Sequence, residues 1–142
     1  MTLPNLTIRL AAQAELDFVR QIDRHIPVEV AARKIEAQEI LVAEANGALV
    51  GYLRLEFLWS LVPYIALIRV LPEHQRQGVG RALLAFLEDR LHRQGHTVLY
   101  SSSQADEAEP QAWHRHMGFV ECGFVAGINA GGVGEIFFCR QL

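Results

Sequence analysis

Residues 71–84 read Leu-Pro-Glu-His-Gln-Arg-Gln-Gly-Val-Gly-Arg-Ala-Leu-Leu, and this stretch decides how the rest of the chain is interpreted. An apolar, strand-like run from Tyr64 to Leu71 leads into it, and an amphipathic helical pattern follows Gly78 and Gly80. Glycine permits a tight turn and lets backbone N–H groups approach a ligand closely. A helix that begins at this point adds unpaired N–H donors and the positive end of its dipole. The stretch therefore predicts a site for a phosphate or pyrophosphate group.

Two well-known phosphate-binding loops do not match this stretch. A P-loop ends in Gly-Lys-Ser/Thr, whereas Arg81 and Ala82 follow Gly80 here. A dinucleotide-binding loop needs a third glycine, at the position of Leu83, and an acidic residue about twenty positions later. Residues 100–103 contain no acidic residue. The sequence therefore excludes both the P-loop and the dinucleotide-binding loop.

The pattern that does match is Gln/Arg-x-x-Gly-x-Gly/Ala, which begins here at Gln75 and is preceded by Ile68-Arg69-Val70-Leu71-Pro72. It resembles the acetyl-CoA pyrophosphate loop of the GNAT N-acetyltransferase superfamily. A second segment, residues 112–119, resembles the family's late helix, which ends at a Gly-Phe pair like Gly118-Phe119. The resemblance implies an α/β fold of GNAT type, with a mixed central sheet of about seven strands, splayed between the fourth and fifth, and about four flanking helices.

The predicted order of elements supports this resemblance over essentially the whole chain. Hydrophobic periodicity and turn residues predict a strand, two helices, three strands, a helix, a strand, a helix and two strands. Asn46-Gly47 is the strongest hairpin signal, between the second and third strands. The elements are expected at residues 6–10, 14–25, 28–39, 40–44, 48–57, 64–71, 79–94, 97–101, 111–117, 120–126 and 135–140.

Composition and charge narrow the class of protein. The chain has 142 residues, of which 51% are hydrophobic, and a formal net charge of −3. We therefore expect a single N-acetyltransferase domain over residues 1–142, without the basic surface that nucleic acid requires. No apolar run reaches the roughly 18 residues of a membrane span, and the N-terminus lacks a signal-peptide pattern, so we expect a cytoplasmic protein. No zinc-type spacing of His, Cys and carboxylates is present, so no metal is expected.

The resemblance implies that acetyl-CoA is the cosubstrate and that two segments bind it. Ile68, Arg69 and Val70 are expected to pair through their backbone with the pantetheine arm, as an added strand would. The Val70 N–H is expected to donate to the oxyanion of the reacting carbonyl. The residues expected to hold the pyrophosphate are Arg76, Gln77, Gly78, Val79, Gly80 and Arg81.

The resemblance also implies direct acyl transfer from the thioester to an amine, which needs a proton donor for the leaving thiolate and a base for the amine. The family's acid is commonly a Tyr four residues before the Gly of Gly-Phe, and this chain has His114 at that position. Histidine can donate a proton, and Tyr100 on the adjacent strand is a second candidate. Glu56 is the first candidate for the base and Glu135 the second, and a chain of water molecules is a third alternative.

We therefore predict an N-acetyltransferase that acetylates a primary amine of a small molecule, an amino acid, or a peptide or protein N-terminus. Trp59, Phe57, Tyr64 and the glycine-rich segment 127–134 are expected to border the acceptor, and the polar run 101–104 is interpreted as a strand end rather than as a serine nucleophile. Three alternatives remain: a non-catalytic acyl-CoA sensor, a transferase of a longer acyl group, and an interaction domain without a cofactor. A homodimer is one assembly that the resemblance allows, because many relatives dimerise.

Overall fold

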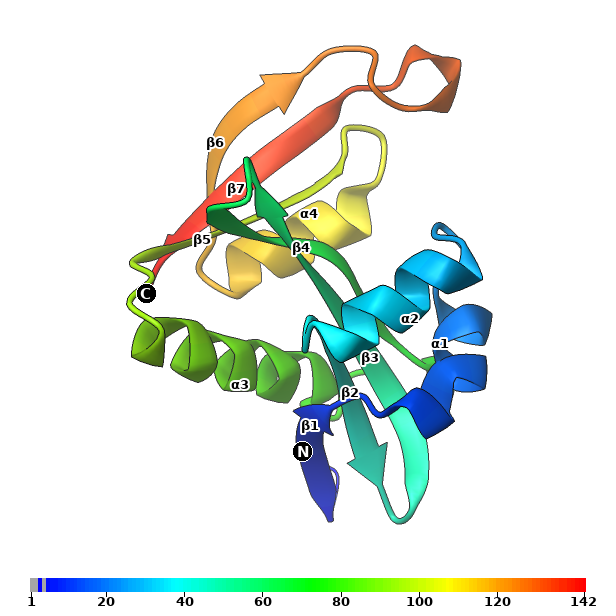
Figure 1. Ribbon diagram of the computed structural model, residues 1–142. Helices are drawn as coiled ribbons and strands as arrows, with labels where there is room; N and C mark the ends of the chain where they lie inside the picture. Colours follow the sequence, from blue (N-terminus) through cyan, green and yellow to red (C-terminus); the bar gives the residue numbers. More distant parts are fainter. Residues whose placement is uncertain (1–2, 4) are drawn as a thin grey trace.

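The computed structural model describes residue 3 and residues 5–142. Within these residues, one mixed sheet of seven strands is flanked by four α-helices (Figure 1). The strands are β1 Leu6–Leu10, β2 Ile40–Ala45, β3 Ala48–Leu58, β4 Val62–Val70, β5 Val98–Gln104, β6 Val120–Val125 and β7 Glu135–Gln141. The helices are α1 Leu16–Ile22, α2 Val28–Glu36, α3 Val79–Arg93 and α4 Ala108–His116. The strands lie in the order β1-β2-β3-β4-β5-β7-β6, which confirms the predicted α/β architecture.

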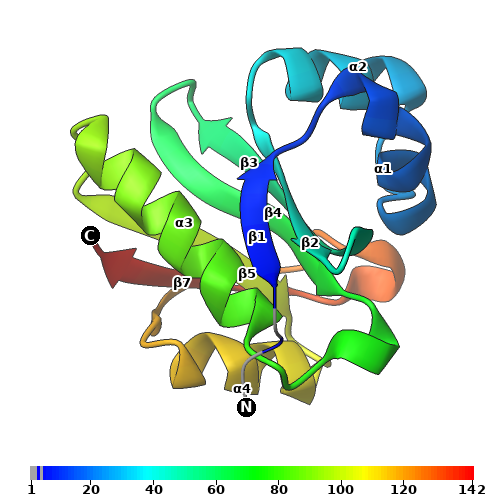
Figure 2. The same ribbon diagram turned by 90° about the horizontal axis from the view of Figure 1, so that it is seen from below.

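Helices cover both faces of the sheet (Figures 1 and 2). On one face, α1 and α2 pack against alternate strand residues such as Ile40, Val42 and Tyr52. On the other face, α3 packs against the intervening residues, including Leu41 and Leu53. This division follows the period of two in a strand, which sends successive side chains to opposite faces. We call the two sides the α1–α2 face and the α3–α4 face, because α4 lies on the same side as α3.

The sheet is split between β4 and β5. These parallel strands pair only at Tyr64–Tyr100 and Ile65–Ser101. Beyond that point β4 continues in pairing with β3, and β5 continues in pairing with β7. A β-bulge interrupts the β3–β4 pairing after Arg54, beside the start of the split, and such bulges bend and twist a strand. The predicted splay between the fourth and fifth strands is thereby confirmed.

Several elements differ from their predicted limits; α1 ends at Ile22 rather than at residue 25, and α2 ends at Glu36 rather than at residue 39. The fifth strand was expected to end at Ser101, but it pairs with β7 as far as Gln104. Serine is a weak strand former, so the serine run gave no strand signal beyond residue 101. α4 begins at Ala108, and Pro110 lies in its first turn, where the missing N–H of proline costs no intrahelical bond. Among the helices described, none has the length and apolar character that a membrane span would require.

Candidate active site

The loop after β4 presents free backbone donors at the start of α3. Gly78 caps the 15-residue helix with φ 84°, and Arg76 adopts φ 62° just before it. The Ala82 N–H donates to the Gly78 carbonyl at 3.0 Å. The three N–H groups before Ala82, those of residues 79–81, therefore have no intrahelical acceptor. The residues expected to hold a pyrophosphate thus lie together, at the positive end of a helix.

The two glycines of the loop have different surroundings. A Cβ built at Gly78 would meet no heavy atom within 4 Å, so the space above this glycine is open to a ligand. A Cβ at Gly80 would instead lie 3.5 Å from Trp113 Nε1 of α4. A side chain at residue 80 would therefore be in ordinary van der Waals contact with Trp113 rather than in the open space above the loop, and the Gly80 N–H remains one of the free donors. The open space beside the loop is therefore found at Gly78.

The part of β4 beside the split has backbone groups that β5 does not pair. The Leu71 N–H donates to the Val50 carbonyl of β3 at 2.9 Å. Because backbone groups of successive residues point to opposite edges of a strand, the backbone of Ile68 and Val70 faces the split and that of Arg69 faces β3. The Arg69 side chain lies on the α1–α2 face, where Nη1 donates to the Ile22 carbonyl at 2.9 Å.

Buried polar atoms around the split and the loop are consistent with a polar ligand. Within the described residues, His74 Nδ1, Gln77 Oε1 and Ser103 Oγ are buried without a hydrogen-bond partner. His74 and Gln77 belong to the loop, and Ser103 belongs to β5 beyond the start of the split. Buried polar atoms are normally paired in folded proteins. The loop therefore fits the pyrophosphate of acetyl-CoA, and the split fits its amide-containing pantetheine arm.

His114 is buried on the α3–α4 face, where β4 and β5 part. Its Nδ1 lies 2.7 Å from the Pro110 carbonyl, and its Nε2 lies 2.7 Å from Ser101 Oγ. A carbonyl only accepts, so Nδ1 carries the proton and Nε2 accepts from the Ser101 hydroxyl. Burial lowers the pKa of His114, which favours this neutral form. Ser101, which is 2% exposed, was not predicted as the partner of His114, because thirteen positions separate the two in the sequence.

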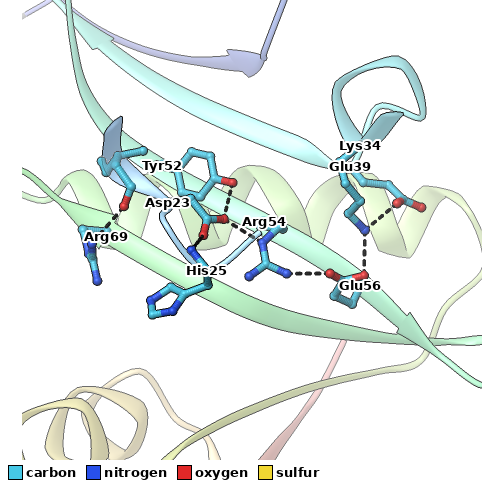
Figure 3. A network of polar contacts seen from close by, with 9 residues as sticks. Asp23, His25, Lys34, Glu39, Tyr52, Arg54, Glu56 and Arg69 are labelled. Carbon is cyan, nitrogen blue, oxygen red and sulfur yellow. Dashed lines mark hydrogen bonds and ion pairs between the residues drawn. The ribbon is translucent and has the colours of Figure 1, made fainter. Parts of the chain in front are cut away.

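Glu56 and Tyr100 lie on the opposite face from His114. Glu56 Oε1 accepts from Lys34 Nζ at 2.9 Å, and Oε2 accepts from Arg54 Nη1 at 2.6 Å (Figure 3). Both oxygens of this candidate base are thus engaged by cations. Tyr100 shares the face of Tyr64, its partner across the parallel pair. The structure therefore does not bring the two candidate acids, His114 and Tyr100, together.

A buried carboxylate joins the end of α1 to β3. Asp23 Oδ2 accepts from the Tyr52 hydroxyl at 2.6 Å and from Arg54 Nε at 2.7 Å (Figure 3). Burial alone would raise the pKa of Asp23, but the hydrogen bonds from Tyr52 and Arg54 outweigh it and hold that pKa below its usual range. Burial and the Asp23 carboxylate raise the pKa of Tyr52. Beside this network, the end of α1 and the α1–α2 turn line a hollow of about 480 Å³ that includes Asp23, Arg20 and Arg24.

A second polar chain crosses three strands on the same face. The Tyr64 hydroxyl lies 2.5 Å from Ser102 Oγ, and Ser102 Oγ donates to Glu135 Oε2 at 2.5 Å. Asn129 Nδ2 donates to Glu135 Oε1 at 2.9 Å. Sequence reasoning named Tyr64 and Glu135 separately, but no sequence signal joined them through Ser102.

The expected acceptor rim is only partly present. Tyr64 and the segment around Asn129 lie on the α1–α2 face, as described. Phe57 packs instead against the α3–α4 core, and its ring lies tilted beside His96, at 5.8 Å between ring centroids. Trp59 lies in the β3–β4 turn and is 83% exposed. No group of three or more His, Cys, Asp or Glu in the described part of the chain is arranged to hold a metal ion.

Comparisons with known proteins agree with this geometry. The acetyltransferase (GNAT) family model matches residues 9–119. The chain therefore belongs to the GNAT acetyltransferase family.

Individual relatives resemble the chain to different extents. An L-methionine sulfoximine/L-methionine sulfone acetyltransferase from Salmonella typhimurium is 26% identical over 137 residues, which cover 81% of this chain and 80% of the relative. A [ribosomal protein bS18]-alanine N-acetyltransferase from Escherichia coli is 43% identical over 54 residues, 38% of this chain and 36% of the relative. A Salmonella typhimurium structure solved with acetyl-CoA matches with a TM-score of 0.82 at 24% identity, over 97% of this chain and 94% of that one, and shares its fold.

Proposed function

We propose that this protein is an N-acetyltransferase that transfers the acetyl group of acetyl-CoA to an α-amino group, either of a free amino acid or of a peptide or protein N-terminus. The observation that carries the proposal is the split between β4 and β5, which leads directly into the open loop at Gly78. The choice of acceptor is supported by the two relatives, whose names specify a methionine derivative and a ribosomal-protein alanine. Both of these acceptors carry an α-amine.

The chain would hold acetyl-CoA along the loop and the split. The N–H groups of residues 79–81 would bind the pyrophosphate, and Arg76 and Arg81 would add positive charge near it. The backbone of Ile68 and Val70 would pair with the pantetheine arm. Acetyl-CoA supplies an activated acetyl thioester, and the Val70 N–H is the proposed donor to the carbonyl oxygen as negative charge develops on it.

His114 and Ser101 are the proposed proton-transfer pair for the leaving thiolate. Neutral His114 has no proton to give from Nε2, because Nδ1–H is directed to the Pro110 carbonyl. Ser101 Oγ, 2.7 Å from Nε2, lies at the start of the split, and its hydroxyl can pass a proton to the thiolate while Oγ takes up the second proton that the attacking nitrogen loses. In this arrangement His114 acts through Ser101. Tyr100 is on the opposite face and is the weaker candidate.

The proposal is tested by calorimetry and turnover with the full chain. Acetyl-CoA at about a hundred times its Kd should stabilise the protein by about 2.7 kcal/mol, whereas ATP and NAD should not. Release of free CoA thiol should then accompany acetylation of L-methionine sulfone or of a hexapeptide that begins with alanine. Binding without turnover on either probe would favour an acyl-CoA sensor, and absence of binding at millimolar acetyl-CoA would exclude the enzyme.

A further inference from the structure

The hydrogen bonds that join Tyr64, Ser102 and Glu135 all run in one direction, from donor to acceptor toward Glu135. An ionised carboxylate only accepts hydrogen bonds, so Ser102 donates its one proton to Glu135 Oε2, at 2.5 Å. Ser102 Oγ must then accept from the Tyr64 hydroxyl, also at 2.5 Å. The Tyr64 oxygen keeps a lone pair that can accept from a further donor. The three groups are therefore aligned to pass a proton from Tyr64 toward Glu135.

The hydrogen-bonded chain of Tyr64, Ser102 and Glu135 lies beside the start of the split between β4 and β5. Tyr64 belongs to the last stretch where β4 still pairs with β5, and Ser102 is the first residue of β5 beyond it. Both lie on the α1–α2 face, whereas His114 and the start of α3 lie on the α3–α4 face. A cosubstrate that enters from the α3–α4 face and lies in the split leaves the α1–α2 face to the acceptor amine. Tyr64 is therefore placed where that amine would arrive.

Further contacts fix the two end members of this hydrogen-bonded chain, Glu135 and Tyr64. Asn129 Nδ2 donates to the other oxygen of Glu135, at 2.9 Å, and fixes the rotation of the carboxylate. The Tyr64 ring stacks on Phe137 of β7, with 5.8 Å between centroids. Burial raises the pKa of the Tyr64 phenol, so this group stays protonated at neutral pH and can relay a proton without storing one.

The surroundings of the two candidate carboxylates differ. The charges of Arg54 and Glu56 on β3 affect the pKa of Tyr64, and the charge of Glu135 affects the pKa of His114 from the other side of the sheet. Glu56 is bound by two cations, Lys34 and Arg54. Among the described residues, the side chains that bond Glu135 are the hydroxyl of Ser102 and the amide of Asn129, both neutral. A proton added to Glu135 therefore breaks no ion pair with the residues described, whereas a proton added to Glu56 would break two.

We propose that Glu135 is the general base of the reaction and that it receives the proton of the acceptor ammonium through Tyr64 and Ser102. The proposal rests on the acetyltransferase function proposed above. An ammonium N–H bond breaks as its proton moves to the Tyr64 oxygen, the Tyr64 proton moves to Ser102 Oγ, and the Ser102 proton moves to Glu135 Oε2. The products are a neutral amine and a Glu135 carboxylic acid, which is partly buried and releases its proton to water.

The remaining protons balance in the transfer itself. The amine lone pair forms the bond to the acetyl carbon, and the C–S bond breaks with its electron pair leaving on sulfur. The nitrogen loses a second proton in this step, and the thiolate takes one up. The overall reaction converts an ammonium and a thioester into an amide, a thiol and one proton.

The test is the pH dependence of kcat, with the alanine peptide and acetyl-CoA as probes. At pH 7 we expect Glu135→Gln to lower kcat by about 10²-fold, the scale of a lost general base, with unchanged acetyl-CoA affinity. The deficit should shrink toward pH 9, because a peptide α-amine with a pKa of about 8 then deprotonates in water. Glu121→Gln, the same change on the exposed strand β6, is the matched control and should leave kcat unchanged.

Two further comparisons identify the relay itself. Ser102→Ala and Tyr64→Phe should reproduce the deficit, and Ser102→Thr, which keeps a hydroxyl, should restore most of the rate. The double variant Tyr64→Phe/Glu135→Gln should be no slower than Glu135→Gln alone, because members of one relay act as a unit. A deficit that is equal at all pH values, or losses that multiply in the double variant, would overturn the relay. A wild-type protein inactive with every probe would instead overturn the proposed function.

Discussion

At the scale of single residues, Asp23 shows how one buried charge fixes a segment of the chain. It ends α1, is 1% exposed, and accepts hydrogen bonds from Tyr52, from Arg54 and from the His25 N–H. The bond from Arg54 is also a salt bridge, with the Asp23 side chain fully buried. A buried pair of this kind destabilises the protein strongly when one partner is removed, because the other charge is left without compensation. Asp23 therefore holds the end of α1 against the strand that carries Glu56.

We expect Asp23→Asn to lower the free energy of unfolding by about 3 kcal/mol at pH 7. Asp89→Asn removes the partner of Arg93 in an ion pair whose side chains are 74% and 63% exposed, and it should cost less than about 0.5 kcal/mol. Urea unfolding of both variants measures the difference. Equal losses would mean that Asp23 contributes no more than a surface charge.

The difference in stability between the wild type and Asp23→Asn should depend on pH, and its sign can be worked out. The pKa of Asp23 is lower in the folded state than the value of about 3.9 expected for the unfolded chain. Its stabilising contribution is therefore complete above about pH 4 and is lost as the pH falls through the folded-state pKa. The stability gap between wild type and Asp23→Asn should narrow below pH 4. A gap that stays constant down to pH 3 would contradict the ion-pair account.

At the scale of elements, α3 has a glycine with positive φ at each end. Gly78 has φ 84° and Gly95 has φ 92°, and a Cβ at either position would meet no atom within 4 Å. Alanine in this conformation costs about 1 kcal/mol, so Gly78→Ala and Gly95→Ala should lose similar stability. Only Gly78→Ala should weaken acetyl-CoA binding, by about tenfold or more, since its methyl group enters the proposed pyrophosphate site. Titration calorimetry of both variants checks this, and equal affinities would remove the loop from the binding site.

The elements themselves could largely be predicted from the sequence. The pyrophosphate loop and α3 were readable because glycines, a preceding strand and a helical pattern adjoin each other in the chain. The end of β5 was not, because Ser101, Ser102 and Ser103 lack strand propensity and are held in the sheet by pairing with β7. That pairing partner lies more than thirty residues away. Tertiary pairing, rather than local preference, sets the length of this strand.

The candidate site was less predictable than the fold for the same reason. His114 could be named from its place before Gly118-Phe119, but its contact with Ser101 depends on how α4 packs on β5. Tyr64, Ser102 and Glu135 meet only because β4, β5 and β7 are neighbours in the sheet. No local spacing encodes this, since the hydrogen-bonded pairs are 38 and 33 positions apart.

At the scale of the whole molecule, the split divides the sheet into β1–β4 and β5-β7-β6, joined along the sheet by two residue pairs. An extended ligand between the two halves of the sheet would replace the missing strand pairing. It would hold β4, which leads into the loop, and β5, on which α4 packs, together. We therefore expect acetyl-CoA to slow hydrogen exchange at the N–H groups of Ile68 and Val70 by about tenfold or more. The Leu71 N–H, already bonded to the Val50 carbonyl, is the internal control and should change less. Amide exchange followed by NMR resolves these neighbours. Slower exchange at residues 79–81 with no change at Ile68 and Val70 would mean that the pyrophosphate binds while the pantetheine arm lies outside the split.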